Sequence, residues 1–180
     1  MSSGVFAVAL FGSAFFQAAW VVKDIHAAME QWTRNHGVGP FFLAPNLSLK
    51  GTRYRGQPAS FTFSGAMAQA GDIQIELIEQ HDDGPPVYRD RVNQGVHHLG
   101  VITKDLDKDV ESYQSKGFSV FVNGSFGDVR FAYMDTRPAI GCLTELVQDG
   151  DSIRRMCAVG ANAAAGWNGD RPVRLLADYL

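Results

Sequence analysis

Apolar and polar positions along this 180-residue chain alternate between two periods. An apolar run at 15–22 has the length of a β-strand, and the apolar residues at 25–35 recur at the spacing of three and four that is typical of a helix. The same order returns later, with a strand pattern at 96–103 and a helical pattern at 106–116. The pattern therefore predicts two units that each begin with a strand and a helix.

Each unit continues with three short apolar stretches, which are separated by glycine and proline turns and so predict three more strands. These strands are expected at 52–55, 59–67 and 72–78 in the first unit and at 119–123, 129–134 and 141–147 in the second. We therefore predict an α+β fold of two tandem βαβββ modules, at 14–80 and 95–149. A loop at 82–86 and a short helix at 87–93 join them.

The N-terminal arm at 1–13 is apolar and carries no charged residue. A secretory signal would begin with a basic segment, and this one does not. A membrane span needs about 20 apolar residues, and Gly12, Ser13 and Gln17 interrupt the stretch. We expect instead an extra strand at 6–11 that packs on another subunit.

The C-terminal tail at 150–180 contains a stretch rich in Ala, Asn and Gly at 160–169, which we expect to be loose. The sequence R-P-V-R follows at 171–174. The tail is expected to serve as a surface lid or as a dimer contact.

The sequence also repeats itself residue by residue. Q-A-A-W-V-V-K-D at 17–24 matches H-L-G-V-I-T-K-D at 98–105, and I-E-L-I-E-Q at 75–80 matches T-E-L-V-Q-D at 144–149. Four polar side chains consequently stand at equivalent places in the two copies: Gln17, Glu76, His98 and Glu145.

Equivalent strand positions project onto equivalent faces, because side chains along a strand alternate with period two. If the modules pack face to face, the four polar side chains can meet at one point. Two carboxylates, one imidazole and one amide oxygen form a mixed nitrogen and oxygen shell that suits Zn, Mn, Fe, Co or Ni. We therefore predict one divalent metal ion as cofactor, held by these four residues.

Each candidate ligand also has an ordinary structural interpretation. Gln17 lies in an apolar strand, where a buried amide commonly just finds hydrogen-bond partners. Glu76 and Glu145 would be costly in a core without a cation, but both can instead face solvent. His98 follows His97, and the repeat selects His98 as the ligand.

Composition excludes several classes of function. The net charge is −3 and no basic block occurs, so nucleic acid is not an expected partner. The two cysteines, Cys142 and Cys157, form no C-x-x-C motif, which favours a reducing compartment without a disulfide framework. We expect a cytoplasmic protein that does not bind a membrane.

The doubled pattern resembles the vicinal oxygen chelate superfamily, which includes glyoxalases, bleomycin resistance proteins and extradiol dioxygenases. The resemblance lies in the His or Gln that opens each module and the E-L strand that closes it, over residues 14–149. It implies a homodimer and a curved, mostly antiparallel sheet around a divalent metal. The ligand order Gln, Glu, His, Glu is closest to glyoxalase I, and methylmalonyl-CoA epimerase uses a related set.

Both of those enzymes remove a proton from a carbon next to a carbonyl group. The resemblance therefore implies a metal-dependent isomerase, epimerase or lyase that acts through a metal-stabilised enolate. Glu145 would be both ligand and catalytic base, and Glu76 would be a static ligand or the second base.

The sequence differs from both glyoxalase I and the epimerases at one functional position each. Val21 stands where glyoxalase I has a glutathione-binding arginine, and 40–70 lacks the additional acidic residue of the epimerases. Two alternatives stay open: a metal-free protein of the same fold that sequesters a small molecule, and a non-haem iron dioxygenase. For the latter, Gln17 is a poor substitute for a second histidine.

The substrate is expected to be a small molecule that is acidic or linked to CoA and has an apolar body. Aromatic and basic side chains on the predicted strands supply the candidate binding residues: Phe61, Phe63, Tyr133, Arg53, Arg55 and Arg130. Such residues are also common in ordinary cores and on solvated strand faces.

Overall fold

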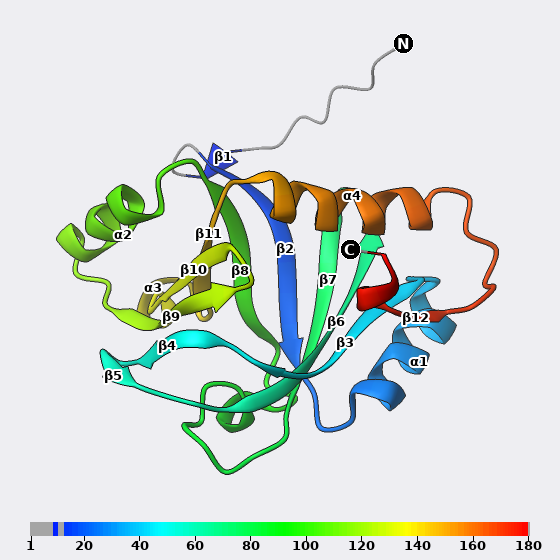
Figure 1. Ribbon diagram of the computed structural model, residues 1–180, viewed down its shortest axis with the longest axis horizontal. Helices are drawn as coiled ribbons and strands as arrows, with labels where there is room; N and C mark the ends of the chain where they lie inside the picture. Colours follow the sequence, from blue (N-terminus) through cyan, green and yellow to red (C-terminus); the bar gives the residue numbers. More distant parts are fainter. Residues whose placement is uncertain (1–8, 11–12, 180) are drawn as a thin grey trace.

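The computed structural model describes residues 9–10 and 13–179, which form one curved, unclosed sheet flanked by helices (Figure 1). The strands are β1 (Ala9–Leu10), β2 (Ser13–Val21), β3 (Phe41–Ser48), β4 (Lys50–Tyr54), β5 (Gln57–Pro58), β6 (Thr62–Ala70), β7 (Ile73–Gln80), β8 (Val96–Thr103), β9 (Val120–Phe126), β10 (Val129–Met134), β11 (Leu143–Gln148) and β12 (Val173–Leu175). The helices are α1 (Ile25–His36), α2 (Leu106–Ser115), α3 (Arg137–Ile140) and α4 (Asp151–Ala164), with single 3₁₀ turns η1 (Arg89–Arg91) and η2 (Leu176–Asp178). The strand order is β12-β3-β6-β7-β2-β8-β11-β10-β9-β4-β5, and β1 pairs with β2. Most pairings are antiparallel, so the predicted α+β class and curved, mostly antiparallel sheet are confirmed.

The centre of the sheet reproduces the repeat of the sequence. β2 and β8 pair antiparallel, with Gln17 opposite Gly100 and Ala19 opposite His98. β7 runs parallel beside β2, and β11 runs parallel beside β8. Because Gln17 corresponds to His98 and Ala19 corresponds to Gly100 in the repeat, the two pairings are equivalent. The two halves are therefore related by a local two-fold arrangement about the β2–β8 pair.

The K-D dipeptide that ends each repeated strand has a structural reason. Asp24 accepts a hydrogen bond from the backbone N–H of Ala27 at 2.9 Å and caps α1. Asp105 accepts one from the N–H of Lys108 at 3.1 Å and caps α2. An aspartate at this position satisfies an amide that the first helical turn leaves without a partner.

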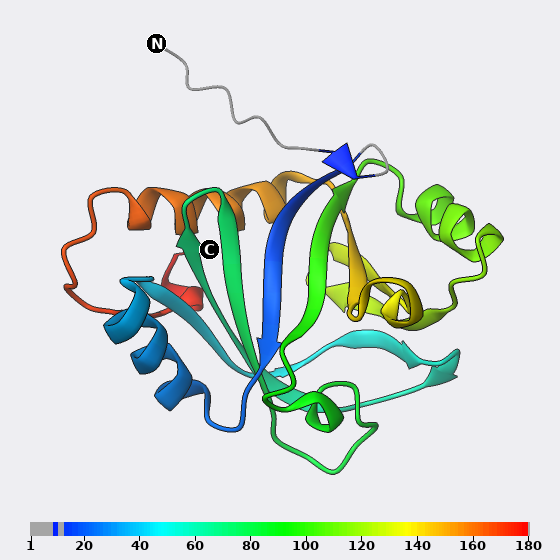
Figure 2. The same ribbon diagram turned by 180° about the vertical axis from the view of Figure 1, so that it is seen from behind.

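The sheet has an outer face covered by helices and an inner face that forms a cup. α1 packs Ile25 and Met29 against apolar residues of the first half, and α2 packs Leu106 against the second half (Figure 2). α4 runs across the mouth of the cup, where Ile153 and Met156 join the inner apolar cluster. Strand alternation thus separates a helix-covered core from a lined cavity.

The strands of the first half differ from the predicted ones. β3 was not among the predicted strands, and it contains Pro45, a residue that is rare in the interior of a strand. The structure absorbs this proline in an irregularity, where the β3–β6 register shifts between Ala44 and Leu47 and Asn46 has a φ of 52°. The strand predicted at 52–55 is β4, which crosses over to pair with β9 of the second half.

The ends of the chain also differ from expectation. Of the predicted strand at 6–11, the structure describes Ala9–Leu10 as β1, and the rest lies outside the described residues. α4 continues to Ala164, into the stretch at 160–169 that was expected to be loose, and β12 then pairs in parallel with β3. In the part of the chain that is described, no helix has both the length and the apolarity to cross a membrane.

Candidate active site

The four candidate ligands lie on the inner face of the four central strands. Gln17 pairs across β2 and β7 with Gln74, and Ala19 pairs with Glu76. On the other side, Gly100 of β8 pairs with Glu145 of β11. Residues paired across strands project to the same side of a sheet. The candidate ligands therefore occupy two adjacent rows of the same concave face and do not turn outward to solvent.

Small residues at the middle of these rows leave room for the long polar side chains. Ala19 lies between Glu76 and His98, and Gly100 lies between Gln17 and Glu145. A Cβ on Gly100 would lie 2.9 Å from the Cβ of Gln17 and 3.1 Å from its Oε1. A larger side chain at this position would therefore collide with the Gln17 amide.

His98 holds the centre of the site. Its side chain is fully buried, and its Nε2 lies 3.2 Å from Glu76 Oε2 and 3.3 Å from Glu145 Oε2. Among the described residues this Nε2 is the one buried side-chain polar atom that makes no properly oriented hydrogen bond. The two carboxylates retain 16% and 12% of their side-chain exposure, so they open into the cavity. Nε2 and two carboxylate oxygens consequently face one small space.

A second histidine fixes which nitrogen of His98 is available. His97 Nε2 lies 3.1 Å from the backbone oxygen of Val87, which can only accept, so this nitrogen carries a proton. In neutral His97 the Nδ1 then accepts from His98 Nδ1, 3.0 Å away. A neutral His98 therefore presents an unprotonated Nε2 to the carboxylates, which is the form that binds metals.

Burial and the neighbouring carboxylates together set the pKa values of His97 and His98. Burial alone would lower the pKa of His98, but Glu145 and Glu76 outweigh it and raise this pKa to about 9. Burial lowers the pKa of His97 to about 3, with a further contribution from His98. Burial also raises the pKa of Glu145. Two carboxylates this close need a shared positive charge, which is either the His98 proton or a cation.

Gln17 completes the set through its amide. Its Nε2 donates to Gln74 Oε1 at 2.7 Å, and both side chains are buried. This hydrogen bond occupies the nitrogen end of the amide and leaves the oxygen end over Gly100, on the side of Glu145. An amide oxygen held in this way is a suitable neutral donor for a divalent cation.

The donor set fits a divalent metal ion. Ligands bound to one zinc at about 2.0–2.2 Å with tetrahedral angles lie roughly 3.3–3.6 Å apart, close to the separations from His98 Nε2 to the two carboxylates. Within the described ranges, however, no group of three or more His, Cys, Asp or Glu side chains has the geometry of a preformed metal site. The ion therefore stays a proposal, supported by the unpartnered Nε2 and by the chemistry of the donors.

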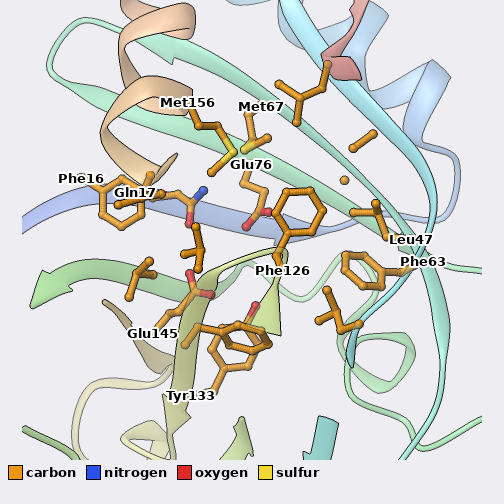
Figure 3. Close-up of a pocket in the computed structure, with 18 of the residues that line it drawn as sticks. Phe16, Gln17, Leu47, Phe63, Met67, Glu76, Phe126, Tyr133, Glu145 and Met156 are labelled. Atoms are coloured by element: carbon orange, nitrogen blue, oxygen red, sulfur yellow. The ribbon is translucent and has the colours of Figure 1, made fainter. Parts of the chain in front are cut away.

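The cavity above these residues has a volume of about 700 Å³ including its open mouth. Its polar wall consists of Gln17, Glu76, Tyr88, Tyr133 and Glu145. The remaining wall is apolar and includes Phe16, Leu47, Phe63, Met67, Phe126 and Met156 (Figure 3). In Figure 3 the polar ends of Gln17, Glu76 and Glu145 point toward one another into this space. A mostly apolar wall with a few convergent polar groups is typical of small-molecule sites.

The aromatic candidates for substrate binding are divided by the structure. Phe63 and Tyr133 line the cavity. Phe61 packs behind them, with its ring centroid 5.8 Å from that of Phe63 and 5.7 Å from that of Tyr88. Phe61 is therefore part of the supporting core in this arrangement.

The three candidate arginines are not brought together and do not line this cavity. Arg130 forms an exposed ion pair with Asp107, and Arg53 donates to the backbone oxygen of Gly56 at 2.9 Å. Arg55 lies over the ring of Phe121 in a second cavity, whose other arginines are Arg91 and Arg137. The acidic or CoA-linked substrate was expected because of these arginines, and their positions do not support that expectation.

Sequence reasoning missed several parts of the cavity. Tyr88 is fully buried, and its hydroxyl lies 3.1 Å from that of Tyr133, which is paired with Glu145 across β10 and β11. Ile153 and Met156 of α4 and Leu176 of η2 close the mouth. The apolar spacing of Ile153, Met156 and Gly160 on α4 was a usable signal for a helix, whereas nothing local marked Tyr88.

Comparisons with known proteins agree with this architecture. The family model described as Glyoxalase/Bleomycin resistance protein/Dioxygenase superfamily matches residues 16–133. The hypothetical protein BH1468 from Bacillus halodurans C-125 is 15% identical, with a TM-score of 0.52 over 77% of this chain and 96% of that chain. A methylmalonyl-CoA epimerase from Mycobacterium tuberculosis is 17% identical, with a TM-score of 0.49 over 78% and 90% of the two chains. One from Streptomyces coelicolor, in complex with 2-nitronate-propionyl-CoA, is 18% identical, with a TM-score of 0.47 over 77% and 95%. A search of curated proteins finds no match.

Proposed function

The chain belongs to the Glyoxalase/Bleomycin resistance protein/Dioxygenase superfamily, and on that premise we propose that it is an isomerase, epimerase or lyase that removes a proton from a carbon next to a carbonyl group. The observation that carries this proposal is the buried His98 Nε2, which faces the carboxylates of Glu76 and Glu145 without a properly oriented hydrogen bond. The three groups combine a basic side chain with a set of metal donors at the inner end of the cavity.

We propose that Gln17, Glu76, His98 and Glu145 hold one divalent cation of the Zn, Ni, Co, Mn or Fe type. When bound, such a cation supplies a Lewis acid for the negative charge that develops on a carbonyl oxygen. His97 keeps His98 in the required tautomer, and Gln74 orients the amide of Gln17.

Glu145 is the proposed base. Burial raises the pKa of its carboxyl group, which strengthens it as a proton acceptor, and Tyr133 lies beside it as its cross-strand neighbour on β10. In the step itself, the C–H proton passes to Glu145 while the C–H electron pair moves toward the carbonyl group. Return of a proton to the opposite face of the same carbon gives an epimer, and return to a neighbouring carbon gives an isomer.

Glu76 lies across His98 from Glu145, since both carboxylates approach the same Nε2. It can serve as a fixed ligand, or as the second base that returns a proton to the opposite face of the substrate carbon. The apolar wall keeps bulk water away from either carboxylate, which strengthens electrostatic interactions at the reacting atoms.

The two rival functions fit the site less well. A protein that only sequesters an apolar molecule would use the same cavity, but it would have no need for two costly carboxylates in the wall. An iron dioxygenase of the two-histidine, one-carboxylate type would need a second imidazole. His97 does not offer one, because both of its ring nitrogens are already engaged.

The proposal is tested first by metal content and proton exchange in the wild-type protein. We expect about one equivalent of a divalent transition metal by elemental analysis after purification without chelator. The loaded protein should exchange the α-protons of small ketones and thioesters with D₂O, as measured by NMR, and EDTA should abolish the exchange. Protein that binds no metal after reconstitution, and catalyses no exchange, would overturn the enzyme proposal in favour of the sequestering protein.

His97 should control metal affinity without being a ligand. Replacing His97 by Leu removes the acceptor for His98 Nδ1, and we expect metal affinity to fall about 10–100-fold in calorimetric titrations. His97→Asn should retain most of the affinity, because its amide oxygen can take the place of Nδ1. If both variants bind metal equally well, His97 has no role in positioning His98. His81→Ala, at a histidine that lies near Ser64 and Glu79, is the matched control.

A further inference from the structure

The wall of the cavity separates one polar end from a long apolar remainder. The polar side chains belong to the central strands, to Tyr88 and to Tyr133 of β10, whereas β3, β6, β9, α4 and the rest of β10 contribute apolar groups. Phe63 and Phe126 supply aromatic rings, and Met67 and Met156 supply flexible thioethers. Such a surface gains free energy by covering hydrocarbon or aromatic groups.

Cations are missing from this wall. Among the described residues, no Lys or Arg lines the cavity. Arg55, Arg91 and Arg137 line the second cavity, which Tyr88, His97 and Tyr133 separate from the first by their ring packing. A carboxylate or phosphate that entered the first cavity would find no guanidinium or ammonium partner among the described lining residues.

The charged groups at the polar end do not supply a spare positive charge in place of the missing cationic side chains. Glu76 and Glu145 contribute two negative charges, and a divalent cation brings the sum to zero. An additional anionic group on the substrate would therefore leave net negative charge in a largely apolar enclosure, which is costly. A neutral carbonyl oxygen carries no such penalty.

We propose that the part of the substrate that enters this cavity is uncharged and apolar: a carbonyl compound with an aromatic or branched hydrocarbon body. The proposal rests on the proposed function for the role of the carbonyl group, but the apolar wall carries the selectivity. It differs from the expectation of an acidic substrate, which rested on the three arginines outside the cavity. A CoA thioester satisfies it when its acyl group is uncharged and its nucleotide stays outside the mouth.

A matched pair of ligands tests this selectivity directly. 2-Acetylnaphthalene is a neutral aromatic ketone, and 6-acetyl-2-naphthoic acid differs from it by one carboxylate. We expect the neutral ketone to bind at least tenfold more tightly to the full-length protein, as measured by isothermal titration calorimetry at neutral pH. Equal or tighter binding of the acid, or failure of both compounds to bind up to their solubility limits, would overturn the proposal.

A charge placed on the wall should reverse the preference. In Met156→Lys, a half-buried position of α4 that lines the cavity gains a cation, and the acid should then bind at least as tightly as the ketone. Val129→Lys is the second choice if the first variant does not fold, and Arg155→Ala, at an exposed neighbour on α4, is the control. An unchanged preference in a folded lysine variant would show that the ligand binds elsewhere.

The two proposals can fail separately. The ligand pair reports binding whether or not the protein holds a metal, while metal content and proton exchange report the chemistry. If the protein prefers the neutral ketone but binds no metal and catalyses no exchange, the proposed apolar site is supported and the proposed enzymatic function is overturned. If the protein catalyses exchange but prefers the acid, the enzymatic function is supported and the proposal of an uncharged substrate is overturned.

Discussion

Replacing Glu145 by Gln should lower the rate of α-proton exchange by about 10³-fold, because the amide cannot accept the substrate proton. The replacement keeps an oxygen donor of similar size at the same place on β11, so metal content should fall much less than the rate does. The measurement is deuterium incorporation by NMR on protein of known metal content. This separation of rate from metal content is what distinguishes a base from a purely structural ligand.

Two comparisons make the Glu145 result interpretable. Glu76→Gln should reduce exchange less than Glu145→Gln if Glu76 is a fixed ligand. If it is a second base, Glu76→Gln should abolish racemisation of a chiral substrate while exchange at one face persists. Glu111→Gln, at an exposed position on α2, should change neither property. Full exchange activity in Glu145→Gln would show that Glu145 is not the catalytic base.

Replacing His98 by Ala should abolish stoichiometric metal binding, with affinity falling at least 100-fold, because the one nitrogen donor of the set is lost. The measurement is elemental analysis together with competition against a chromophoric chelator. His26→Ala, at an exposed histidine of α1, removes the same side chain from the surface and should leave binding unchanged. Retention of a full equivalent of metal in His98→Ala would show that the ion is held elsewhere.

The same variant carries a stability effect that does not depend on metal. Without a cation, the protonated His98 is the positive charge between Glu76 and Glu145, and its pKa of about 9 reflects their attraction. Its removal leaves two buried carboxylates without that partner, which should lower the free energy of unfolding of metal-free protein by about 3–5 kcal/mol. Urea denaturation measures this. A metal-free His98→Ala protein as stable as the wild type would contradict the observed placement of the three groups.

Much of the candidate site could be found from the repeat in the sequence. Gln17, Glu76, His98 and Glu145 were selected because two copies of one strand pattern placed them at equivalent positions, and strand alternation then puts them on equivalent faces. The K-D dipeptides likewise have a local cause, since Asp24 and Asp105 cap the helices that follow. Features of this kind depend on neighbours in the chain, so the chain order alone is enough to predict them.

The rest depended on contacts between segments far apart in the sequence. Arg53, Arg55 and Arg130 looked like candidates for an anion site, but none of them lines the cavity. β4 pairs with β9, which places Arg53 on that strand and Arg55 just after it outside the cup. Tyr88, His97 and α4 reach the site only because the sheet curves around it. The sequence by itself determined the repeated module and its polar residues, because these follow from local periodicity. Only the tertiary structure decided which charges enter the cavity and which apolar groups close it, because strand pairing and sheet curvature arise from long-range packing.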